Sequence, residues 1–288
     1  MLFQAVASGV TAGSVYALVA LAFVLIYKGT RVVNFGQGEQ VMLGAYLVLL
    51  LNTFAGLPFW LAVALALALA GLFGVLIELL VLRRLAASTP LTRIIATLAI
   101  GLILREGARA VMGANAYPFP FLLSPAPVTV GGVLVTPANL AVVVVALVVM
   151  GLFYLFFRRA RLGKALRAAC ENRTAAALMG ISVPFVFSAI WALSSVLAAV
   201  AGVLLAPLVT LTPDMGLVAI KGWVAAVVGG FTSLPGAVVG GVVLGVVETV
   251  SGSYVSTALK DGITYLLLIA VLLLRPSGLL ERRVIRKV

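Results

Sequence analysis

The stretch KGWVAAVVGGFTSLPGAVVGGVVLGVVETV, residues 221–250, decides how this chain folds. It is apolar on both sides of GGFTSLPG, residues 229–236, whose glycines and proline are residues that interrupt helices. It is also longer than the roughly 20 residues that one membrane-crossing helix needs. We therefore predict a re-entrant pair of helices, residues 222–230 and 237–250, with the polar turn deep in the membrane. A single kinked span is the alternative.

The composition places the whole chain in a membrane. Apolar residues make up 64% of the 288 residues and charged residues only 10%, whereas soluble domains have roughly 45–50% and about 25%. A globule of this size cannot bury so many apolar side chains. This excludes an ordinary soluble protein.

The other apolar runs predict an all-α polytopic membrane protein. Most of them have about the length that a transmembrane helix needs. The runs are residues 5–27, 36–54, 59–82, 94–112, 138–157, 183–207 and, shorter, 263–274. We expect about seven full transmembrane helices plus the Gly/Pro-broken re-entrant pair, eight to nine membrane segments in all. They form a single transmembrane domain over residues 1–288.

The basic residues orient these spans. Sixteen of the 20 lysines and arginines gather at residues 28–31, 83–93, 158–173 and 275–287. Lysine and arginine are enriched in cytoplasmic loops, so we predict an external N-terminus and a cytoplasmic C-terminus. Residues 221–250 must then enter and leave on the same side. The net charge of +12 is explained by contact with the lipid bilayer, and no nucleic-acid partner is expected.

Several chemistries are excluded by residues that the sequence lacks. There is no histidine and only one cysteine, Cys170, so neither a metal site nor an internal disulfide is expected. No GxxxxGK[ST] phosphate-binding loop occurs. We therefore predict no catalytic residues and no cofactor bound by this chain, which is not expected to be an enzyme.

The loop at about residues 158–181 carries the most informative polar motif. Asn172 is a good N-cap, the residues after it favour a short helix, and Gly180 is a natural helix terminator. The small side chains of Ala176 and Ala177 favour docking against a cytoplasmic protein. The alternative is an amphipathic helix that rests on lipid, for which bulkier apolar residues are typical.

Two polar groups are candidates for lining a translocation path. Asn34, Gln37 and Glu39 lie at the start of the second apolar run, where a helix N-terminus could receive a carboxylate. A capping cluster, with Asn34 as N-cap, is the alternative. The second group lies in the turn of the re-entrant pair, where freed backbone groups need partners; it consists of Thr232, Ser233 and Pro235.

Charged residues also lie inside the predicted spans, where they are costly unless paired or facing a cavity. Arg105, Glu106 and Arg109 fall in one span, and we expect them near the outer surface, with Glu106 paired to an arginine. Glu248 could pair with Lys221 or Lys260.

Three blocks of sequence resemble the branched-chain amino acid (LivH-type) family of ABC importer permeases. The first is RLGKALRA at 161–168, with EN at 171–172 and AALMGI at 176–181. The second is YALVAL at 16–21, LIYKGT at 25–30 and NFGQGE at 34–39. The third is VGGFTSLPGA at 228–237 with GGVVLGVVE at 240–248. The resemblance extends over nearly the whole chain.

The resemblance implies a permease subunit of an ATP-driven importer in the bacterial cytoplasmic (inner) membrane. Two cytoplasmic ATPase subunits would bind ATP and Mg²⁺, a second homologous permease subunit would complete the pore, and an external solute-binding protein would deliver the substrate. The cargo would be branched-chain or other small neutral amino acids. The residues expected to couple to the ATPases are Asn172, Arg173, Ala176, Ala177, Leu178, Met179 and Gly180.

Two alternatives stay open at this point. The same family includes permeases for urea and short amides, and a self-sufficient secondary transporter also uses broken helices. The sequence does not tell whether the second permease subunit is identical to this chain or a paralogue.

Overall fold

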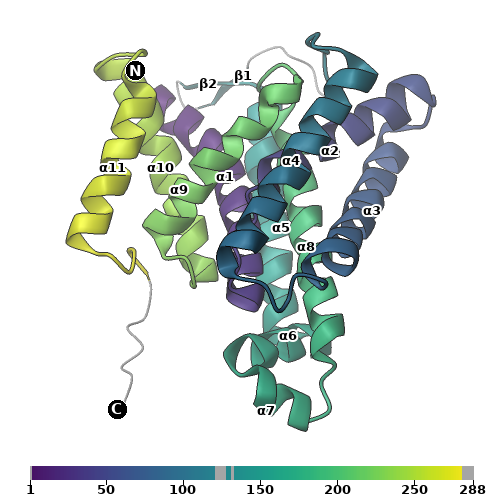
Figure 1. The fold of residues 1–288 in the computed structure, drawn as a ribbon. Helices are drawn as coiled ribbons and strands as arrows, with labels where there is room; N and C mark the ends of the chain where they lie inside the picture. Colours follow the sequence, from purple (N-terminus) through teal and green to yellow (C-terminus); the bar gives the residue numbers. More distant parts are fainter. Residues whose placement is uncertain (1, 121–127, 131–132, 281–288) are drawn as a thin grey trace.

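The computed structural model describes residues 2–120, 128–130 and 133–280, and these form a bundle of α-helices. Most of the helices stand side by side, with α6 and α7 together at one end and the strands β1 and β2 at the other (Figure 1). The helices are α1 (Leu2–Thr30), α2 (Gln37–Leu49), α3 (Phe59–Ile77), α4 (Pro90–Met112), α5 (Pro137–Arg159), α6 (Arg161–Glu171), α7 (Arg173–Leu178), α8 (Val183–Leu205), α9 (Val218–Gly229), α10 (Leu234–Tyr254) and α11 (Lys260–Leu274).

Short irregular elements extend or connect these helices. The π-helical turns η1 (Leu50–Phe54) and η2 (Glu78–Leu82) continue α2 and α3 without a break, and the 3-10 helix η3 (Pro213–Leu217) leads into α9. Strands β1 (Val128–Val130) and β2 (Val133–Val135) pair antiparallel. The side chain of Gln4 fixes β2 to the start of α1, because its amide donates to the Leu134 carbonyl at 2.6 Å and accepts from the Leu134 amide at 3.0 Å.

Helix α1 is the centre of the bundle. It packs against α5, α8, α9 and α10, and 89% of its most apolar window is buried. A helix that is apolar all round can lie in lipid or among other elements, and here the neighbouring helices cover it. The purple ribbon of α1 accordingly runs behind α9 and among the other helices (Figure 1).

Glycines allow α1 and α10 to come into backbone contact. A Cβ atom added to Gly9 would lie 2.7 Å from Cα of Val246, and one added to Gly13 would lie 2.8 Å from Cα of Val242. Gly245 of α10 faces Gly13 in return. Glycines at GxxxG spacing permit such close approach of membrane helices, and Gly9 and Gly13 have this spacing.

The chain is a multi-helical membrane protein, although the predicted number of spans is not confirmed. Among the described residues, five helices are long and apolar enough to cross a membrane: α1, α3 with η2, α5, α8 and α10. Helices α2, α9 and α11 are shorter, and α4 contains four charged residues. Seven full spans plus a re-entrant pair therefore stays a prediction.

The predicted break in residues 221–250 is confirmed, but its turn does not lie deep in the bundle. Helix α9 ends at Gly229 and α10 begins at Leu234. The ring of Phe231, in the turn, contacts the ring of Tyr27 in the last full turn of α1, at a centroid distance of 4.7 Å. Gly222 packs on Val19 of α1, and the part of α9 that follows Gly222 is about as long as the part of α1 between Val19 and Tyr27. The α9–α10 turn therefore lies beside the end of α1.

Four charged residues tie α9, α10 and α11 together. Lys221 Nζ lies 2.7 Å from Glu248 Oε1 and 2.9 Å from Asp261 Oδ1, and Lys260 Nζ lies 3.0 Å from the same Glu248 oxygen. The Glu248 side chain is only 1% exposed. Glu248 thus pairs with both of the lysines that the sequence offered as alternatives.

The last basic cluster lies largely outside the described residues. Arg275 follows α11, whereas the other basic residues of this cluster fall within 281–288.

Replacing Glu248 should destabilise the protein strongly. Glu248→Ala leaves two lysines without their buried partner, and breaking a buried ion pair costs about 3–5 kcal/mol. We expect a clearly lower midpoint of thermal unfolding in detergent. Asp261→Asn is the matched control: its side chain is 63% exposed, so a much smaller shift is expected. Equal shifts for the two variants would contradict this account.

Candidate functional site

The segment that joins α1 to α2, residues 31–36, turns back into the bundle. Arg31 has a φ of 58°, which reverses the chain after the last turn of α1. The Gln37 amide donates to the Ser194 carbonyl at 3.3 Å, and the Ser194 hydroxyl donates to the Ala22 carbonyl at 2.9 Å. Helix α2 therefore begins opposite Ala22, roughly two turns before α1 ends.

Asn34 and Gln37 are engaged in holding this buried connection. Both are almost completely buried. The Asn34 amide donates to Gln37 Oε1 at 2.9 Å, and Asn34 Oδ1 accepts from the Gly36 amide at 3.1 Å. Gly36, rather than Asn34, occupies the N-cap position of α2. Asn34 shapes the turn before the helix and does not cap it.

The side chain of Glu39 points toward α4 rather than toward Asn34 and Gln37, and it forms an ion pair that the sequence pattern did not predict. Its Oε1 lies 2.5 Å from Nη2 of Arg105 in α4, and the side chains are 8% and 21% exposed. The predicted arginine partner of Glu106 is Arg109, at 2.9 Å, and Arg109 also contacts Asp214 at 2.7 Å. Arg105 is thus the one arginine of α4 that pairs with Glu39.

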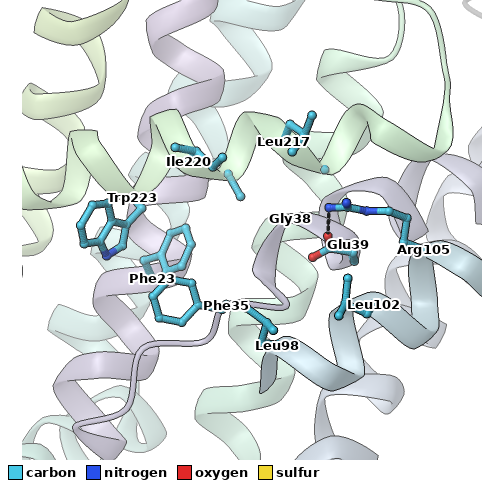
Figure 2. Close-up of a pocket in the computed structure, with 12 residues that line it drawn as sticks. Phe23, Phe35, Gly38, Glu39, Leu98, Leu102, Arg105, Leu217, Ile220 and Trp223 are labelled. Atoms are coloured by element: carbon cyan, nitrogen blue, oxygen red, sulfur yellow. Dashed lines mark hydrogen bonds and ion pairs between the residues drawn. The ribbon is translucent and has the colours of Figure 1, made fainter. Parts of the chain in front are cut away.

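The Glu39–Arg105 pair borders a cavity of about 430 Å³. Figure 2 shows the pair at one end of this cavity and the rings of Phe23, Phe35 and Trp223 toward the other. The lining comes from α1, the re-entering connection, α2, α4, η3 and α9, and comprises Phe23, Phe35, Gly38, Glu39, Leu98, Leu102, Arg105, Gly216, Leu217, Ala219, Ile220 and Trp223. We call it the pair cavity.

The second predicted group lies apart from the pair cavity, in the α9–α10 turn. Ser233 caps α10, because its hydroxyl accepts from the Gly236 amide at 3.1 Å. Thr232 is half-buried, and Pro235 is exposed. Pro235 lines a different, apolar cavity of about 410 Å³ between α5 and α10. The structure therefore does not bring the two predicted groups together.

The predicted short helix in the loop at 158–181 is α7, and its ends are formed as expected. Asn172 Oδ1 accepts from the Ala175 amide at 3.0 Å. Gly180 has a φ of +80°, which suits glycine at a helix end. The preceding helix α6 packs on α5, α1 and α8.

The outward face of α7 differs from the prediction of small residues. Ala176 is buried at 4% exposure, whereas Leu178 and Met179 are 83% and 82% exposed. Ala177 is exposed as well. Ala176 is part of the buried core, so the free surface of α7 presents bulky apolar side chains next to Ala177.

Arg173 fastens α7 to the rest of the bundle. Its Nη2 donates to the Gly29 carbonyl, in the last turn of α1, at 2.9 Å. Its guanidinium also lies over the Phe187 ring of α8, 4.7 Å from the centroid. A cation next to the C-terminal carbonyls of a helix is favourable. Helix α7 is thereby joined to the end of α1 and to α8.

Comparison with known proteins identifies the family. Residues 5–272 match the model of the family described as branched-chain amino acid transport system / permease component. The chain belongs to this family. It is 33% identical to the high-affinity branched-chain amino acid transport system permease protein LivH of Escherichia coli K12, over 99% of this chain and 97% of that protein.

Further relatives in the same permease family agree over most of the chain. BraD of Pseudomonas aeruginosa, a permease protein of a high-affinity branched-chain amino acid transport system, is 32% identical over 99% of this chain and 97% of its own length. A probable LivH permease of Methanocaldococcus jannaschii is 33% identical over 91% and 87%. These relatives are permease subunits of transporters, and this member of the family is a transport subunit rather than an enzyme.

Burial should shift the titration of Cys170 in α6. Burial raises the pKa of this thiol, while the nearby cations Lys28, Arg173 and Arg31 lower it in part. Because the thiolate is the reactive form, alkylation of Cys170 should reach half its maximal rate at a higher pH than alkylation of an exposed cysteine. Glu171→Cys in a Cys170→Ala background is the matched exposed control. Identical pH profiles would contradict the partly buried position of Cys170.

Proposed function

We propose that this chain is the membrane-spanning permease subunit of an ATP-driven ABC importer for branched-chain amino acids. Family membership and full-length similarity to LivH and BraD permeases support this. The proposed assembly adds a second homologous permease subunit, two cytoplasmic ATPase subunits that bind ATP and Mg²⁺, and an external solute-binding protein. The lack of a phosphate-binding loop in this sequence fits that division of labour.

In the proposed topology the chain lies in the bacterial inner membrane with α6 and α7 in the cytoplasm. The N-terminus and β1–β2 are then external, and the C-terminus is cytoplasmic. The basic residues of the loop at 158–181 support this orientation, because they fall on α6 and α7 and at the adjacent end of α5. The spans would be α1, α2 with η1, α3 with η2, α4, α5, α8 and α11. Helices α9 and α10 would form a pair whose outer ends are both external and whose turn reaches the cytoplasmic end of α1.

We propose that α7 receives the movement of the ATPases. Leu178 and Met179 are exposed apolar side chains next to Ala177, and exposed apolar groups of this kind suit a protein contact. Arg173 links α7 to Gly29 in α1. The end of α1 leads directly into residues 31–36, which return to the pair cavity at Phe35. A shift of α7 would thus be passed to the cavity wall through covalently continuous backbone.

The proposal is tested by reconstituting this chain with its partner subunits and binding protein in proteoliposomes. ATP-dependent uptake of leucine is expected, with none in the absence of ATP. Ala177→Arg should reduce uptake at least about tenfold while the ATPases still hydrolyse ATP, because a bulky charge blocks the contact but leaves the bundle intact. Ala87→Arg, at an exposed position between η2 and α4, is the matched control and should transport normally.

Two results would overturn parts of this account. Uptake by this chain alone, driven by a cation gradient and indifferent to ATP, would contradict the importer. Normal uptake by Ala177→Arg would show that α7 is not the coupling helix.

A further inference from the structure

We infer that the pair cavity is a transient binding site for the transported amino acid: Arg105 takes its carboxylate, Glu39 takes its ammonium group, and the apolar wall takes its side chain. This inference rests on the proposed function and adds to it a substrate-contacting site within this subunit. Arg105, which the sequence placed near the outer surface, becomes a specificity-determining residue.

The Glu39–Arg105 ion pair is costly at its position in the bundle. Glu39 and Arg105 come from different helices, and their side chains are only 8% and 21% exposed. Withdrawing two charges from water costs several kcal/mol per ion, and well-packed apolar residues often stabilise such a position equally well. Stability alone therefore does not account for this pair in a bundle that is otherwise rich in apolar side chains. Intramembrane ionisable residues are by default candidates for function.

The Glu39–Arg105 pair also keeps unused hydrogen-bonding capacity. A guanidinium has five N–H donors in a fixed planar arrangement. Within the described residues, Nη2 of Arg105 meets Glu39, whereas its Nε is buried and has no hydrogen-bond partner. A carboxylate can occupy two such donors at once. The other oxygen of Glu39, Oε2, packs against Gly101, where an added Cβ would lie 2.9 Å from it; the absence of a side chain at Gly101 is what lets the carboxylate sit beside Arg105.

The pair cavity has a size and shape that suit an amino acid. Its volume of about 430 Å³ falls within the roughly 300–1,000 Å³ that is usual for small-molecule sites. The two charges lie at one end and the rings of Phe23, Phe35 and Trp223 lie toward the other (Figure 2). A zwitterionic head with an aliphatic side chain has the same division into a charged end and an apolar end.

The site would hold its ligand only briefly, because the ligand has to compete with the ion pair that Glu39 and Arg105 form with each other. Without substrate, Glu39 and Arg105 neutralise one another, so neither charge is left unpaired in the membrane. A bound zwitterion would replace the Glu39–Arg105 ion pair by two ion pairs with the ligand, one at each side chain, without changing the net charge of the site. An uncharged amide offers no such exchange, which favours amino acids over urea or short amides as cargo of this site.

Neutralising both residues tests the inference. In the reconstituted complex, the double variant Glu39→Gln/Arg105→Gln should take up leucine at least about tenfold more slowly, the effect of losing a charged hydrogen bond of about 1.5–3 kcal/mol. Removing both charges avoids leaving one unpaired, and co-purification with the ATPase subunits verifies folding. The control Glu78→Gln/Arg83→Gln removes another ion pair, 2.8 Å long and outside the cavity lining, and should transport within about twofold of the wild type.

Exchanging the charges separates binding from a structural role. Glu39→Arg/Arg105→Glu restores an ion pair but inverts the site, so the ammonium and carboxylate of leucine would have to reverse relative to the apolar wall. Uptake should remain low in this variant. Uptake restored to the wild-type level would show that the pair only joins α2 to α4, and would overturn the inference.

A protection experiment reports binding directly. Ile220→Cys in a Cys170→Ala background places the only thiol on the cavity wall. Leucine should slow its alkylation, whereas 3-methylbutylamine and 4-methylpentanoate, which lack one charge each, should not. Equal protection by all three would overturn the inference. If the wild-type complex shows no ATP-dependent uptake, the proposed function itself fails; if the wild type and Glu39→Gln/Arg105→Gln transport equally, only the inference fails.

Discussion

Close packing around α1 is the constraint on which the rest of the structure depends. Gly9 and Gly13 bring its backbone against α10, and its other faces are covered by α5, α8 and α9. The same helix carries Phe23 in the pair cavity and the Gly29 carbonyl that Arg173 binds. In the proposed mechanism a displacement at the Gly29 end is transmitted to the cavity, because close-packed interiors transmit strain.

The two groups of paired charges have different surroundings and, in our account, different roles. Lys221, Glu248, Lys260 and Asp261 contact one another across three helices, which suits a structural anchor. Glu39 and Arg105 instead border an open cavity with apolar walls. An ion pair can serve as a binding site only where a ligand can reach it. What distinguishes the Glu39–Arg105 pair from the group around Glu248 is therefore its access to a cavity, not the strength of its ionic contacts.

Much of the fold could be predicted from hydropathy and helix-ending residues. The predicted span at residues 59–82 coincides with α3 and η2, and GGFTSLPG marks the break between α9 and α10. The Asn172 cap and the Gly180 terminator of α7 are also local signals. The partner of Glu39 could not be predicted, because it depends on the contact between α2 and α4. The sequence did not predict that residues 31–36 return into the bundle, because they adjoin a basic cluster and resemble a surface loop. Helix α7 has only six residues, which is too few for periodicity to show which alanine faces inward.

The central claim, that movement at α7 reaches the pair cavity through α1, is tested most directly by the alkylation rate of Phe35→Cys in a Cys170→Ala background. The rate is measured in the reconstituted complex with and without ATP. The account predicts that ATP changes this rate and that Arg173→Ala removes the change, because the contact between α7 and Gly29 is lost. A rate that does not respond to ATP, or that responds equally with Arg173→Ala, would contradict it.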